Sequence, residues 1–158
     1  MKHMKYLETK IDPSTKESEL QLCIQCDLDT FEWLMKYIHS DLTNQRVTYS
    51  CREPGNDTTD SDSYKHQEGE LELNLQNIIK LLIPAEFLKI ETLRNECINF
   101  IGQNIEAITK MKINMNFLQQ ETFAKLATKI DTEVLDTLRE RKDKFITKLF
   151  DRKLQQLL

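Results

Sequence analysis

The stretch NLQNIIKLLIPAEFLKIETLRNECINFI, residues 74–101, decides the fold class of this chain. Its apolar residues recur at helical spacing in two runs. The first holds Leu75, Ile78, Ile79 and Leu82, and the second holds Leu93, Cys97, Phe100 and Ile101 and continues beyond the stretch to Ile105 and Ile108. Asn74 is placed to cap the first helix, and Pro84 is expected to break or kink it before Phe87 and Leu88 continue the apolar face. The stretch therefore predicts a pair of amphipathic helices.

The segment upstream predicts a strand followed by a helix. Residues 19–26 alternate as ELQLCIQC, which puts Leu20, Leu22 and Ile24 on one face of a strand. Asp29 and Glu32 then form an acidic variant of a capping box, and a helix of about three turns runs to His39. We expect residues 20–38 and 71–108 to share one core that contains Leu22, Ile24, Phe31, Leu34, Ile79, Leu82, Leu93 and Ile101.

Trp33 and Tyr37 lie four residues apart on a flanking face of the same helix. They could pack against the next element or form an exposed anchor for a partner. We favour packing, because aromatic pairs at helical spacing usually belong to a core.

The remaining segments differ sharply in composition. Residues 1–12 indicate a short helix that ends near Pro13, and residues 46–50 indicate a short strand. Residues 51–70 are polar, acidic and nearly free of aliphatic side chains, so they predict a mobile loop.

The last third of the chain predicts two further helices. The first covers residues 117–130, and the second begins at Asp131 or Thr132 and continues without Gly or Pro to Leu157. Residues 139–153 hold seven basic residues and three acidic ones. This basic face is either simply solvated or a docking site for an acidic partner or nucleic acid.

The composition argues against an enzyme, a metalloprotein and a dedicated nucleic-acid binder. The net charge is -4, and the sequence holds no Gly-rich phosphate loop, HExxH motif or GxSxG motif. Cys23 and Cys26 form a CxxC pair without a second ligand pair at finger-like spacing, so structural thiols are favoured over zinc or redox chemistry. We therefore expect no catalytic residue, no metal and no cofactor.

The chain also lacks an apolar run long enough to span a bilayer and the apolar core of a secretory signal. We therefore expect an intracellular, soluble protein without a membrane partner.

The order of the segments resembles the second half of a BTB/POZ domain. The resemblance is carried by FEWLMKYI (residues 31–38), by the polar loop, and by the helical pair with the phrase FLKI (residues 87–90). The phrase Cys26-Asp27 before that first helix and the tail KDKF (residues 142–145) with KLF (residues 148–150) are similar to the BTB region of the SANT and BTB domain regulator of class-switch recombination family.

This resemblance implies an α+β, mostly helical fold, BTB/POZ-like and truncated at the N-terminus, with a C-terminal helical extension. Residues 1–110 would form the BTB/POZ-like domain, with the flexible acidic loop at about 51–70, and residues 111–158 the extension with its basic amphipathic helix. Because the usual first hairpin and helix would precede Met1, the isolated chain is expected to be monomeric or weakly associated.

The implied function is that of a protein-interaction scaffold, which mediates self-association or partner binding in a regulatory complex. The resemblance implies a nuclear location and a role in transcription or chromatin regulation, although cytoplasmic and cytoskeletal locations stay open. The alternatives are a cullin-RING ubiquitin ligase adaptor similar to elongin C, and a structural component of a larger assembly. The candidate partner-binding residues are Phe31, Trp33, Met35, Tyr37, Phe145, Leu149, Lys142, Lys144 and Lys148.

Overall fold

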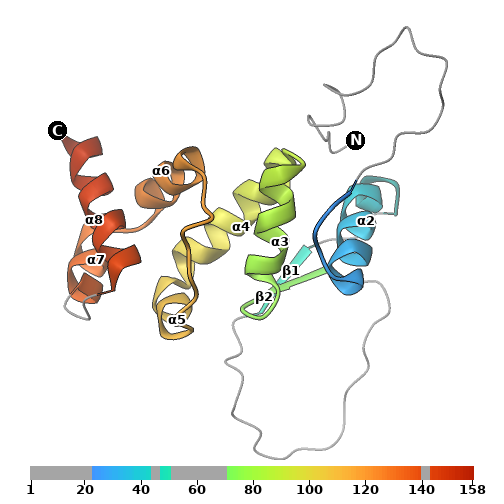
Figure 1. Ribbon diagram of the computed structural model, residues 1–158, viewed down its shortest axis with the longest axis horizontal. Helices are drawn as coiled ribbons and strands as arrows, with labels where there is room; N and C mark the ends of the chain where they lie inside the picture. The colour runs from blue at the N-terminus through green and yellow to red at the C-terminus, as the bar shows by residue number, and fades with distance from the viewer. Residues whose placement is uncertain (1–22, 44–46, 51–70, 140–142) are drawn as a thin grey trace, which may run out of the picture.

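The chain is mostly helical with one small sheet. The computed structural model describes residues 23–43, 47–50, 71–139 and 143–158. Its elements are α2 (Leu28–Thr43), β1 (Val47–Ser50), β2 (Leu71–Asn74), α3 (Ile78–Phe87), α4 (Glu91–Gln103), α5 (Ile105–Lys110), α6 (Gln120–Lys129), α7 (Thr132–Arg139) and α8 (Lys144–Leu157). They follow one another along the long axis, from α2 and the strands at one end to α7 and α8 at the other (Figure 1).

Several sequence predictions fall outside the described residues. These are the short helix within residues 1–12, the part of the first strand before Cys23, and the acidic loop at residues 51–70. The described part of that strand, residues 23–26, lies in no helix or strand, so the strand prediction was wrong there.

Helix α2 begins two residues earlier than its capping signal suggested. The Asp27 carboxylate accepts a hydrogen bond of 2.8 Å from the backbone amide of Thr30, which makes Asp27 the cap. Asp29 instead lies in the first turn, where its negative charge faces the positive end of the helix dipole.

The strands β1 and β2 form a parallel pair in which Val47 is opposite Leu71 and Ser50 is opposite Asn74. The predicted strand at residues 46–50 is confirmed, whereas β2 was not predicted. In β2 the leucines Leu71 and Leu73 are buried. Asn74 does not cap a helix: its side-chain oxygen accepts hydrogen bonds from the amides of Gln76 and Asn77, each 3.0 Å long, and forms the turn from β2 into α3.

The predicted helical pair is present, but its interruptions lie elsewhere. Pro84 stands inside α3 without ending it, and the break comes at Lys89, whose φ of 54° is left-handed. There the Lys89 amide bonds the Glu86 carbonyl and the Ile90 amide bonds the Ala85 carbonyl, which is the hydrogen-bond pattern of a Schellman motif. The second helix of the prediction is likewise divided at Asn104 into α4 and α5.

The predicted last helix is in fact two helices. Helix α7 ends at Arg139, α8 begins at Lys144, and the two pack against each other. The Asp143 carboxylate begins α8 by accepting hydrogen bonds of 2.7 Å from the Phe145 amide and 3.3 Å from the Ile146 amide. The chain therefore folds back here, although no Gly or Pro marks the position.

The buried side chains form one continuous cluster that reaches from α2 to α8. Leu34, Leu82, Leu93 and Ile101 lie in it as predicted. Ile24 and Ile79 are only partly buried, Phe31 is exposed, and Leu22 lies outside the described residues.

Helix α4 packs on both α3 and α6, and at Gly102 a Cβ atom would meet the Cβ of Lys129 at 3.3 Å. The missing side chain thus lets α4 and α6 approach closely. Among the described residues, no helix is long and apolar enough to cross a membrane.

Candidate protein-interaction surfaces

The aromatic pair of α2 belongs to the interior. Tyr37 is fully buried, and Trp33 stacks on it with a distance of 5.4 Å between the ring centroids. The Trp33 indole also donates a hydrogen bond of 3.2 Å to the backbone carbonyl of Glu72 in β2, and burial raises the pKa of the Tyr37 hydroxyl. Tyr37 therefore has no exposed surface to offer a partner, and the pair packs as predicted.

Phe31 lies on the outside instead, together with apolar side chains that sequence analysis did not select. It is 39% exposed, and Leu28 on the same first turn is 69% exposed. On α3, Ile83 and Phe87 are 43% and 45% exposed. We call these four residues the α2–α3 face. Met35 is partly buried against the core and does not belong to it.

An ion pair joins the two helices that carry the α2–α3 face. The Lys80 ammonium lies 3.0 Å from the Asp27 carboxylate, which joins the start of α2 to the first turn of α3. Lys80, Ile83 and Phe87 follow one another at spacings of three and four, so they lie on one side of α3. Hydrogen bonds from Thr30, together with that from Lys80, lower the pKa of Asp27 to about 2.

The CxxC pair lies beside this face. Cys23 is exposed and Cys26 partly buried, and both are free thiols. Burial, with a smaller contribution from the negative charge of Asp27, raises the pKa of Cys26. A raised pKa disfavours the thiolate that both redox chemistry and metal binding require. Cys97 is buried in α4, and burial also raises its pKa.

At the opposite end of the molecule, α8 and the segment before α6 border a groove of about 830 Å³. Leu149, on the inner side of α8, is fully buried and so has no exposed surface to offer a partner. Lys144 and Lys148 are exposed and line the groove, as does the partly buried Phe145. Lys142 lies outside the described residues.

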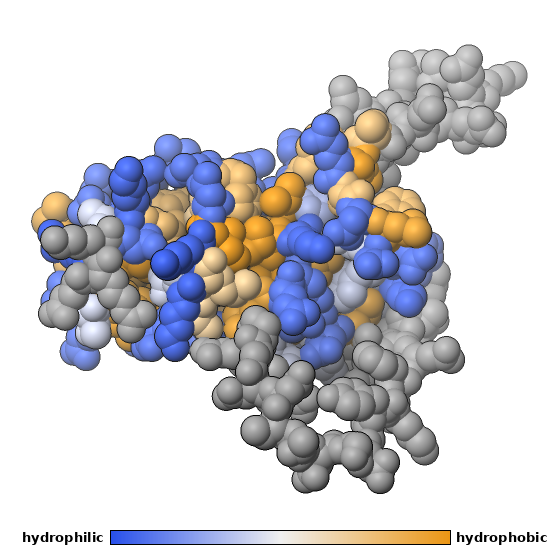
Figure 2. Space-filling view, turned by 60° about the horizontal axis from the view of Figure 1, so that its bottom comes forward, coloured by the Kyte–Doolittle hydropathy of each residue, from blue (hydrophilic) through white to orange (hydrophobic). Residues whose placement is uncertain are grey.

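Figure 2 shows where apolar and hydrophilic side chains lie on one face of the molecule. Apolar surface gathers in the middle of the view, and the end formed by α7 and α8 is mainly hydrophilic. The exposed side of α8 carries charged side chains around the groove, whereas the α2–α3 face carries aliphatic and aromatic side chains.

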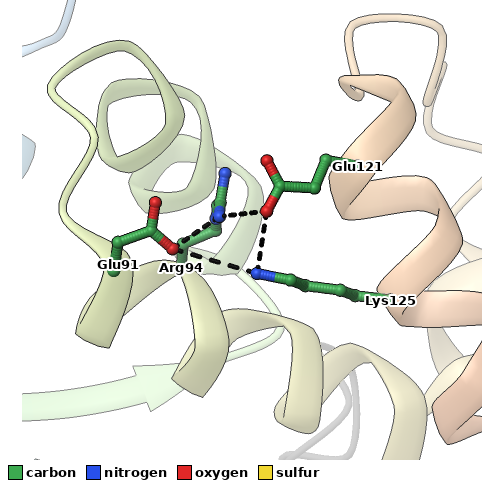
Figure 3. Close-up of polar contacts among 4 residues, drawn as sticks. All are labelled: Glu91, Arg94, Glu121 and Lys125. Atoms are coloured by element: carbon green, nitrogen blue, oxygen red, sulfur yellow. Dashed lines mark hydrogen bonds and ion pairs between the residues drawn. The ribbon is translucent and has the colours of Figure 1, made fainter.

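A cluster of four charged side chains lies where α4 contacts α6, between the two ends of the molecule (Figure 3). Arg94 on α4 is 3% exposed, and its guanidinium contacts the carboxylates of Glu91 and of Glu121, the latter at 2.9 Å. Lys125 on α6 completes the cluster with a 3.0 Å ion pair to Glu121. The hydrogen bond from Lys125 and the charge of Arg94 lower the pKa of the Glu121 carboxyl.

A family model described as "SANT and BTB domain regulator of CSR, BTB domain" matches residues 1–98, more than half of the chain. The chain belongs to this BTB family. No solved structure was found to match it.

The matched residues include the α2–α3 face and do not include the groove beside α8. The matched residues reach from the N-terminus into α4, which ends at Gln103. BTB membership makes the chain a protein-interaction module in general terms and confirms the resemblance seen in its sequence. The predicted boundary at residue 110 stays a prediction.

Ile83 carried a weak signal that could have identified it as a surface residue. Phe87 was predicted to continue the apolar face with Leu88, but it is 45% exposed, so that prediction was wrong for Phe87 and right for the buried Leu88. Ile83 falls off the apolar stripe that Ile78 and Leu82 define, and an aliphatic residue off its stripe is either buried by a second neighbour or exposed. The sequence gives no means of choosing between these outcomes, because the choice depends on which other helix lies alongside.

Proposed function

We propose that this BTB domain is a scaffold module that associates with itself through the α2–α3 face, within a regulatory complex in the nucleus. The observation that carries the proposal is the exposure of four large apolar side chains, Leu28, Phe31, Ile83 and Phe87, on two elements joined by the Asp27–Lys80 ion pair. Exposed apolar side chains that gather on neighbouring elements mark interaction sites more often than isolated ones do.

The association should be weak. A stable homodimer buries on the order of 1,600 Å² in total, and four partly exposed side chains supply only part of the apolar centre of such an interface. We therefore expect a dimer with a dissociation constant in the micromolar range or above. This agrees with the sequence-based expectation of a monomeric or weakly associated chain.

Sedimentation velocity over a range of concentrations tests the proposal. Phe31→Asp would put a charge into the centre of the interface and should weaken the dimer by about tenfold or more. Leu157→Asp is the matched control, because Leu157 is 66% exposed at the end of α8, far along the chain from the face. A dimer that both variants leave intact, or a wild-type chain that stays monomeric at all concentrations, would contradict self-association through this face.

A cullin-RING adaptor is the alternative, because adaptors of that class share the BTB fold and fold alone does not separate the two functions. Biolayer interferometry with the immobilised chain and a purified cullin N-terminal region distinguishes them. Under the proposed function we expect no saturable binding. Binding that Phe31→Asp removes would favour the adaptor function instead.

A further inference from the structure

We propose that the groove beside α8 is a second docking site, which takes an acidic, apolar-bearing peptide segment of a partner protein. This site lies outside the residues matched by the BTB family and does not depend on the α2–α3 face. Its volume of about 830 Å³ lies in the range of sites that hold a ligand of several side chains.

The floor of the groove is apolar and aromatic. Phe123 of α6 and Phe145 of α8 meet edge to face, with ring centroids 5.9 Å apart and an angle of 76° between the rings. Ile113 and Leu118 continue the apolar lining, and all four side chains are only partly buried. Such a floor offers an aliphatic or aromatic side chain a place to leave water.

One wall of the groove is basic. Lys144, Lys148 and Arg152 line it at intervals of four residues, so they stand in a row along one side of α8. Among the described residues, no carboxylate forms an ion pair with Lys144 or Lys148, and the Arg152 guanidinium donates only to the side-chain oxygen of Gln155. These cations are available to carboxylates supplied from outside.

The two carboxylates that also line the groove favour a peptide over nucleic acid. Asp143 is engaged by two backbone amides at the start of α8, whereas Asp151 is exposed one residue before Arg152. A nucleic-acid backbone carries a charge at every step and would meet Asp151, and the chain as a whole has a net charge of -4. A peptide can place its carboxylates opposite the cations and an apolar residue opposite Phe123 and Phe145, and so keep its charges away from Asp151.

The probe for this site is a fluorescein-labelled helical peptide with glutamates four residues apart and leucine and phenylalanine between them. We expect its fluorescence anisotropy to report saturable binding to the full chain, which weakens as salt is added. The same peptide with glutamine in place of glutamate should bind at least about tenfold more weakly, because it loses the charge-assisted contacts to α8.

Charge reversal on the chain locates the binding site. Lys148→Glu and Lys144→Glu should each weaken binding by about tenfold. Lys129→Glu is the matched control, because Lys129 is an exposed lysine of α6 that does not line the groove, and it should change binding less than about twofold. Circular dichroism melting curves of the variants should overlay that of the wild type.

Three results would overturn the proposal. They are equal weakening by the groove and control variants, equal binding of the glutamine peptide, and preference of the groove for a labelled single-stranded oligonucleotide over the acidic peptide. Since Phe31→Asp leaves the groove intact, it should not change peptide binding, and this keeps the test separate from that of self-association.

Discussion

Glu86, in α3, is the one acidic residue that is buried among the residues the structure describes. It is 5% exposed, and its Oε1 atom has no hydrogen-bond partner. Burial raises its pKa, although the Thr122 hydroxyl, the Gln119 amide and the Arg94 charge act in the opposite direction. Its ionisation therefore opposes the folded state.

This effect predicts how stability changes with pH. Between the ordinary glutamate pKa of about 4 and the raised value, the folded state holds more protons than the unfolded state, so the Glu86 contribution to the free energy of unfolding falls as pH rises. Glu86→Gln should remove this loss, and urea unfolding between about pH 4 and pH 7 measures it. Exchange of the exposed Glu106 for Gln should leave the wild-type profile unchanged. A Glu86→Gln profile parallel to that of the wild type would contradict the prediction.

Two neighbouring positions of α2 should differ strongly in their contribution to stability. Leu34 is fully buried, so Leu34→Ala should lower the free energy of unfolding by about 2 to 5 kcal/mol. Phe31 is 39% exposed, so Phe31→Ala should cost less than about 1 kcal/mol. Chemical denaturation of the two variants measures both values, and equal losses would show that Phe31 belongs to the core.

At the scale of elements, short side-chain contacts determine where helices begin. Asp27 begins α2 and Asp143 begins α8, each by accepting hydrogen bonds from backbone amides that have no partner within the helix. The cap also positions the row of Lys144, Lys148 and Arg152 on α8, because Lys144 follows the capping residue directly. The geometry of the groove thus depends on this contact.

Asp143→Ala should therefore lower the free energy of unfolding by about 1 kcal/mol, the usual cost of losing an N-cap. Asp136→Ala, at an exposed position inside α7, is the matched control and should change stability by less than about 0.5 kcal/mol. Both values follow from urea titrations monitored by circular dichroism. If Asp136→Ala costs as much as Asp143→Ala, the effect comes from lost charge and not from the cap.

At the scale of the whole molecule, the buried side chains make one cluster and not two. The cluster runs from Leu34 in α2 to Leu149 in α8, and the close approach at Gly102 joins α4 to α6 within it. The Arg94–Glu121 contact lies at the same junction. A continuous core of this kind favours cooperative unfolding of all described elements together.

Trp33 is the chain's one tryptophan and lies in α2, at the end of the molecule opposite α8. Its fluorescence reports unfolding of the BTB part, and far-ultraviolet circular dichroism reports all helices. We expect the two urea transitions to coincide. Separate midpoints would show that the BTB domain and the C-terminal helices unfold independently, with a boundary near the predicted residue 110.

The sequence by itself determined the helical pair and the inner side of α2. Leu34, Leu82, Leu93 and Ile101 are buried as predicted, because the periodicity of apolar residues is a local property and any partner that covers the helix must cover that stripe. The phrase at residues 87–90, the two amphipathic helices around it and the phrase at residues 31–38 were among the features that indicated the family.

Only the tertiary structure decided which part of each helix outside its apolar stripe is covered by another element. Tyr37 is buried because β2 and α3 pack against α2, whereas Phe31 lies on a part of the same helix that stays exposed. Strand β2 became a strand by pairing with β1, and α8 turned back onto α7 because Leu149 buries against the core. These outcomes depend on contacts between residues far apart in sequence, whose energies no local pattern encodes.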